Sequence, residues 1–174
     1  MSYPAMQLAA VAMWNLSACS YYVAIDSAQA KAPHRTGRRH MHELVERIKE
    51  PELCYVFARN AARRGHPELA IEAYRRAVDL RAAGYPADND SEIAAALAIF
   101  AYEEALSYRK GKRTSATGTW QLVNRHGLLG AVHRRIQSKT GDEVHAILEQ
   151  LGMAEYSFES VGKAYPEDIQ QAAA

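Results

Sequence analysis

The chain has 174 residues, of which 48% are apolar and 24% are charged, and its formal net charge is +1. These are ordinary globular values, so they exclude global disorder and favour a single domain with a core of its own. The two cysteines, Cys19 and Cys54, form no Cys-x-x-Cys pair, which excludes a zinc knuckle or a disulfide framework and predicts small core residues in a reducing, cytoplasmic setting.

The charges are unevenly distributed along the chain. Residues 105–141 contain eight Lys or Arg residues and no Asp or Glu. The rest of the chain carries a net charge of −7, because these eight positive charges belong to a total of only +1. Clustered positive charge attracts anions, so this segment points to a polyanion or to an acidic protein surface as a partner.

The N-terminal region is expected to form one Ala-rich helix that ends near Ala30. Ala32-Pro33 and Thr36-Gly37 then break the helix. The first 25 residues carry no charged side chain, but no basic segment precedes them and polar residues interrupt them. Neither an export signal nor a membrane span is therefore expected. A short second helix is predicted over residues 39–49, with Leu44, Val45 and Ile48 facing inward.

Residues 52–83 predict an antiparallel pair of helices, with Gly65 as the break and Pro67 at the start of the second helix. Leu53, Val56 and Phe57 are expected to face inward on the first helix. The spacing resembles that of a tetratricopeptide repeat, on the positions Ala58, Gly65, Ala70, Tyr74 and Ala77. The pattern covers about 34 residues and does not recur as a full array.

The residues after the hairpin predict further helices separated by short breaks. Asn89 and Glu92 predict a capping box for a helix over residues 91–109. A basic linker over residues 112–118 precedes two short helices, at 119–125 and 128–138, that Gly127 separates. Thr140 and Glu143 predict the cap of a helix that ends at Gly152, and the tail adds a helix over 154–164 and a turn after Pro166.

Together these signals predict an all-α fold, an irregular multi-helix bundle of about eight helices with one tetratricopeptide-like αα-hairpin. The chain is read as one helical domain over residues 1–174. Residues 1–38 are its Ala-rich helix and basic loop, 39–110 its helical hairpin region, and 111–174 its basic short helices and acidic C-terminal helices.

The candidate binding residues lie in the basic segment. Arg134 and Arg135 project away from the apolar stripe of their helix, and Trp120 or His126 is suited to stacking on an unpaired base. The competing interpretation is that these charges are solvated and that Trp120 is a core residue. The residues expected to contact nucleic acid or an acidic partner are Arg109, Lys110, Lys112, Arg113, Trp120, Arg125, His126, Arg134, Arg135 and Lys139.

A second basic cluster lies at residues 31–42, where four cations alternate with His34, His40 and His42. His40 and His42 diverge on a helix and have no further ligands at a familiar spacing, so no metal site is expected. No catalytic triad or phosphate-binding glycine loop is present either. Glu103 and Glu104 are adjacent, and we interpret them as solvated carboxylates. The sequence therefore predicts no enzyme and no cofactor.

Two sets of motifs together cover about two thirds of the chain. The first set is Ala101-Tyr102-Glu103-Glu104-Ala105, Gly111-Lys112-Arg113, Thr119-Trp120-Gln121, Arg125-His126-Gly127, Ala131-Val132-His133-Arg134, Leu151-Gly152-Met153 and Ser157-Phe158-Glu159. The second is residues 46–51, Asn60-Ala61 and Gly65. The first set resembles an uncharacterised all-helical domain of bacterial hypothetical proteins, and the second resembles a helical module attached to some bacterial endonucleases.

The resemblance implies a bacterial or phage origin and a nuclease-linked setting, and it transfers no catalytic residue. We therefore expect a non-enzymatic accessory module in nucleic-acid processing or defence, whose basic helices contact nucleic acid or an acidic partner. The alternative is a protein-interaction adaptor or homo-oligomer. It would use a groove around Tyr74 and Tyr102, or the Ala-rich first helix.

Overall fold

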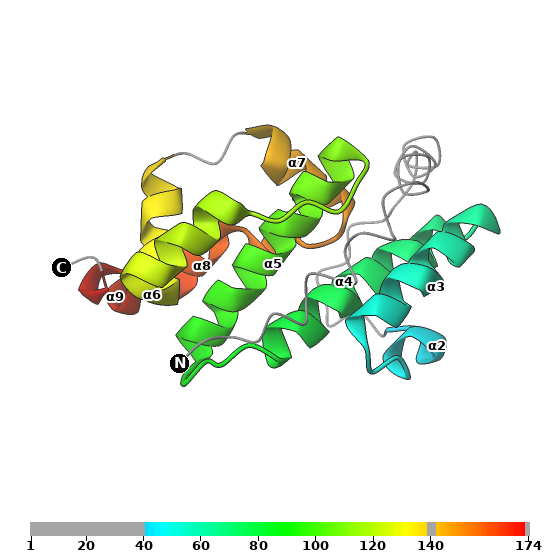
Figure 1. The fold of residues 1–174 in the computed structure, drawn as a ribbon, viewed down its shortest axis with the longest axis horizontal. Helices are drawn as coiled ribbons and strands as arrows, with labels where there is room; N and C mark the ends of the chain where they lie inside the picture. Colours follow the sequence, from blue (N-terminus) through cyan, green and yellow to red (C-terminus); the bar gives the residue numbers. More distant parts are fainter. Residues whose placement is uncertain (1–40, 139–141, 173–174) are drawn as a thin grey trace.

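The computed structural model describes residues 41–138 and 142–172. This part of the chain is all-helical, with eight α-helices, one 3₁₀ turn and no strand. The helix α5 (Asp90–Lys110) lies at the centre (Figure 1). The pair α3 (Pro51–Arg63) and α4 (Pro67–Ala83) packs on one side of it, and α6 (Thr117–Gln137), α7 (Asp142–Gln150) and α8 (Phe158–Ala164) pack on the others.

The predicted helical pair is confirmed as the antiparallel hairpin α3–α4. Pro51 and Pro67 each stand in the first turn of a helix, where the missing amide donor is not needed. Gly65 between the helices has φ +79°, a conformation that costs glycine little.

The inward face of α3 differs from the predicted one. Leu53 is 51% exposed, whereas Cys54, Tyr55 and Ala58 are buried against α4. Small residues let two helices approach closely, and the face of α3 that carries Tyr55 packs in one cluster with the alanines of α4. This contact turns Leu53 toward the solvent.

The second predicted helix is shorter than expected within the described residues. The helix α2 spans Glu43–Glu46, a single turn, and of its predicted inward residues Val45 is fully buried while Leu44 is 52% exposed. One helical turn presents only one side chain to a given neighbour. The backbone is already extended at Glu50, as is favoured before a proline.

The caps of α5 follow the sequence closely. The side-chain oxygen of Asn89 accepts the amide of Glu92 at 2.9 Å, and the Glu92 carboxylate accepts the amide of Asp88 at 2.8 Å. Gly111 ends the helix with φ +64°. Because neighbours cover α5 on several sides, its buried residues include both alanines and polar side chains.

The helix α6 consists of two segments. Gly127 has φ +71° and ψ 178°, so the predicted break between two helices at this glycine is confirmed. The first segment begins at Thr117, two residues before the predicted start.

The C-terminal segments are divided more finely than predicted. Ser157 has an extended backbone and caps α8 by accepting the amide of Ser160, so the helix predicted over residues 154–164 is split into a 3₁₀ turn at Ala154–Tyr156 and α8. The helix α9 (Pro166–Gln171) follows. The proposed cap residue Thr140 and the predicted first helix lie outside the described residues.

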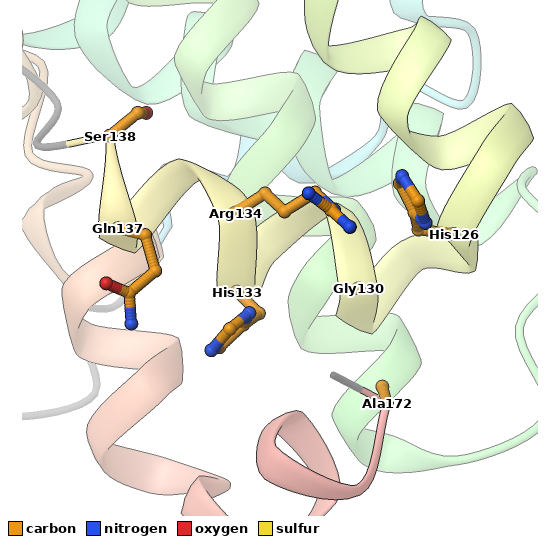
Figure 2. Close-up of a pocket in the computed structure, with 7 residues that line it drawn as sticks. All are labelled: His126, Gly130, His133, Arg134, Gln137, Ser138 and Ala172. Carbon is orange, nitrogen blue, oxygen red and sulfur yellow. The ribbon is translucent and has the colours of Figure 1, made fainter. Parts of the chain in front are cut away.

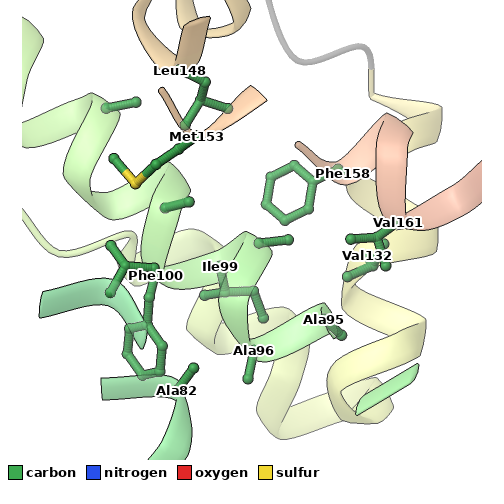
Figure 3. Packing of buried hydrophobic residues seen from close by; sticks show 14 of the residues in the cluster. Ala82, Ala95, Ala96, Ile99, Phe100, Val132, Leu148, Met153, Phe158 and Val161 are labelled. Atoms are coloured by element: carbon green, nitrogen blue, oxygen red, sulfur yellow. The ribbon is translucent and has the colours of Figure 1, made fainter. Parts of the chain in front are cut away.

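The larger apolar core lies around α5. Ile99, Val132, Met153 and Phe158 come from different elements and pack together there (Figure 3). A smaller cluster fills the α3–α4 hairpin, and Tyr108 packs against both clusters. Burial of these side chains is the main source of the stability of such a bundle.

Two isoleucines on α5 test this core. Ile99 is fully buried, so Ile99→Ala should lower the free energy of unfolding by about 2–5 kcal/mol. Ile93 is 43% exposed, and Ile93→Ala should change it by less than about 0.5 kcal/mol. Urea denaturation followed by circular dichroism measures both values, and equal losses would contradict the described packing.

Candidate nucleic-acid interface

A buried carboxylate on α5 organises the start of the basic segment. Glu103 is 3% exposed, and its Oε2 pairs with the guanidinium of Arg81 at 2.5 Å. Its Oε1 accepts three hydrogen bonds, from Ser115 Oγ at 2.9 Å, the Ala116 amide at 2.8 Å and Trp120 Nε1 at 2.7 Å. One side chain thereby joins α4, α5, the loop after α5 and α6.

The protonation of Glu103 follows from these partners. Burial raises the pKa of this carboxyl, but the charge of Arg81 and the hydrogen bonds from Ala116 and Trp120 outweigh burial, so the net pKa is lowered. Glu103 is therefore ionised at neutral pH.

The neighbouring Glu104 has a different set of partners. It is fully buried, and its Oε2 accepts hydrogen bonds from the Tyr55 hydroxyl at 3.2 Å and from Arg113 Nη1 at 3.3 Å. The guanidinium of Arg113 also lies 3.9 Å from the centre of the Tyr55 ring. The two glutamates diverge, as expected for adjacent helical residues, but they are buried and not solvated as predicted. Arginine partners make this burial tolerable.

Three of the predicted binding residues also make contacts within the protein. Arg109 forms an ion pair with Glu143 at 3.1 Å. The guanidinium of Arg135 lies 4.4 Å from the centre of the Tyr102 ring. Trp120 packs against Tyr85 and Phe100 in addition to its bond to Glu103, so its indole belongs to the core.

The other predicted residues differ in their surroundings. Lys139 lies outside the described residues. Among the predicted binding residues, five are exposed and form no ion pair within the described part of the chain. They are Lys110, Lys112, Arg125, His126 and Arg134.

Two of these exposed residues border a hollow of about 590 Å³ beside the second segment of α6. The lining residues are His126, Gly130, His133, Arg134, Gln137, Ser138 and Ala172. The α6 positions from 130 onward recur at intervals of three and four residues, which places them on one face of a helix. Figure 2 shows Arg134 extending along the helix toward His126, whereas His133 and Gln137 point to the side where Ala172 lies. We call this feature the α6 hollow.

The α6 hollow has a cationic lining. Arg134 carries a fixed charge, and His126 and His133 add two imidazoles. No Asp or Glu is found among the described residues that line it. The side-chain amide of Gln137 adds a further group that can donate hydrogen bonds to an anion, whereas the hydroxyl of Ser138 already donates to the carbonyl oxygen of Arg135 at 3.0 Å.

The sequence predicted only part of this hollow. Arg134 and His126 were expected to bind, whereas Gly130 and His133 were not singled out as binding residues. The helical spacing of residues 130, 133, 134 and 137 is the signal that could have found them.

The two tyrosines expected to line a groove, Tyr74 and Tyr102, belong to different apolar clusters. Tyr74 is 3% exposed and packs against Tyr55 in the cluster of the hairpin. Tyr102 belongs to the other side of the bundle, where it packs against Phe158. The described residues therefore do not bring these two tyrosines together on one surface.

The described residues contain no group of three or more side chains suited to hold a metal ion. His42 caps α2 by accepting the amide of Leu44 at 3.2 Å, and the other residues of the second basic cluster, apart from Met41, lie outside the described part.

Burial raises the pKa of Cys54 to about 11, which keeps its thiol protonated. Within the described part, no helix has the length and apolar character needed to span a membrane.

Comparisons of the chain with protein-family models, with curated proteins and with solved structures find no match. The resemblance noted from the sequence therefore stays a prediction, and the interpretation of the site rests on its geometry.

The role of Glu103 can be tested by pH. Because its pKa is lowered in the folded state from the ordinary value of 4.5, its stabilising effect is complete only above that value and is lost as the pH falls through the folded-state pKa. We expect Glu103→Gln to lower the free energy of unfolding by about 2–4 kcal/mol at pH 7. The difference from the wild type should shrink below pH 4.

The matched control is Glu143→Gln, which removes the exposed ion pair with Arg109 and should cost less than about 1 kcal/mol. Urea denaturation at several pH values measures both variants. A Glu103→Gln penalty that does not change with pH would contradict the assigned charge.

Proposed function

We propose that the chain is a non-enzymatic accessory module that binds nucleic acid, with the second segment of α6 as its contact surface. The bacterial or phage setting implied by the sequence resemblance is consistent with this function. The observation that carries the proposal is the α6 hollow, which Arg134 and two imidazoles line with no described carboxylate among its lining residues. Arg125 is exposed next to it in the sequence and adds a further fixed charge.

The donor set favours phosphate over a carboxylate surface. A phosphate group presents oxygens in several directions, and the guanidinium, imidazole and amide groups of the hollow can donate hydrogen bonds to it from several sides. Imidazole rings also stack on unpaired bases. The charge distribution supports this choice, because the acid-free segment contains α6 and reduces repulsion of an approaching polyanion.

The proposal is tested by fluorescence anisotropy with a labelled single strand and a duplex of the same sequence. Phosphate contacts release counterions, so two or three contacts should weaken binding about tenfold between 50 and 200 mM salt. Arg125→Glu combined with Arg134→Glu should abolish most of the binding. Absence of binding in low salt, or binding without salt dependence, would refute the proposal.

A charge-matched control separates a local site from the net charge of the protein. Lys49 and Arg64 are exposed near the ends of α3, and in the fold they belong to the hairpin side of α5, away from α6 (Figure 1). The double variant Lys49→Glu, Arg64→Glu changes the net charge by the same amount. It should reduce affinity far less than the α6 variant, and equal losses would show that no specific surface is used.

A further inference from the structure

The α6 hollow is concave, and this shape needs an explanation beyond backbone contact. Its volume of about 590 Å³ lies within the range of small-molecule sites, roughly 300–1,000 Å³. A continuous nucleic-acid backbone can be contacted by side chains on a convex helix surface and requires no hollow. A recess of this size suits a chemical group that projects from a nucleic-acid strand.

Gly130 accounts for the close approach of the chain on one side of the hollow. A Cβ atom at this position would lie 2.8 Å from His126 Cβ and 3.4 Å from the carbonyl oxygen of Ala172. The absence of a side chain therefore permits the close approach of His126 to the second segment of α6, and the end of α9 lies at contact distance on the same side.

We infer that the α6 hollow receives the terminal phosphate group of a nucleic-acid strand, with Arg134, His126 and His133 as its ligands. This inference rests on the proposed nucleic-acid binding and specifies which part of the strand is recognised. A terminal phosphate carries a charge of about −1.5 to −2 at pH 7 and three free oxygens. A phosphodiester carries a single charge and has two of its oxygens esterified, so it uses fewer of the available donors.

The surrounding elements do not cancel this cationic lining. The acids of α8 and α9, which pack against α6, are Glu159, Glu167 and Asp168, and none of them lines the hollow. On α5, Glu103 and Glu104 are bound to Arg81 and Arg113, and Asp90 and Glu92 do not line the hollow. Arg134 and the two imidazoles thus line the hollow without a described carboxylate beside them.

The test compares one single-stranded oligonucleotide in three forms, with a 5′-phosphate, with a 3′-phosphate and with hydroxyl groups at both ends, each labelled internally. Charge-assisted hydrogen bonds to a terminal phosphate should make at least one phosphorylated form bind about fivefold or more tightly than the unphosphorylated form. The two phosphorylated forms show which end enters the hollow. Adenosine 5′-monophosphate and adenosine 3′-monophosphate should displace the strand at lower concentrations than adenosine.

Variants assign the preference to the hollow. His133→Gln and Arg134→Gln should reduce the difference between phosphorylated and unphosphorylated strands to less than about twofold. Arg125→Gln removes a neighbouring charge that does not line the hollow. It should weaken all three strands alike and leave their ratio unchanged. Circular dichroism confirms that the variants are folded.

The outcomes separate this inference from the proposed function. Equal affinities of wild-type protein for the three strands would overturn terminal-phosphate recognition and leave nucleic-acid binding intact. A preference that survives both His133→Gln and Arg134→Gln would place the phosphate elsewhere and also overturn the inference. Failure of all three strands to bind would refute both proposals.

Discussion

The carboxylate of Glu103 is the constraint on which the arrangement around α5 depends. It lies in the interior, and an unpaired charge there would be too costly for the folded state. Arg81 from α4, the loop after α5 and Trp120 from α6 must therefore all reach it at the same time. Such a buried pair adds little net stability compared with apolar packing, but we infer that it specifies the position of the loop and of α6.

The position of α6 divides the basic segment into two functional parts. Close to α5, Arg113 lies on Glu104 and Tyr55, and Arg109 pairs with Glu143, so these cations serve the fold. After the break at Gly127, Arg134 forms no ion pair with either buried glutamate and lines the hollow. The binding surface that we propose is consequently smaller than the eight-cation segment, and it is shaped by the packing of α9 against α6.

Local signals account for most of what the sequence predicted correctly. The hairpin around Gly65 and Pro67, the cap at Asn89 and the break at Gly127 all depend on backbone preferences within a few residues. The errors concern faces and neighbours. The outward orientation of Leu53 and the burial of both glutamates depend on which helices pack together, and no local pattern of residues contains that information.

The sequence by itself determined that the chain is helical, where most helices of the described part begin and end, and that its positive charge is concentrated around α6. These properties follow from periodicity, from glycine and proline, and from composition. Only the tertiary structure decided which cations remain available to a partner. The pairs Arg81–Glu103 and Arg109–Glu143 join residues 22 and 34 positions apart, and the α6 hollow requires the end of α9 to meet Gly130. Such long-range contacts form only when the helices pack, because packing sets the distances between charges that sequence spacing leaves open.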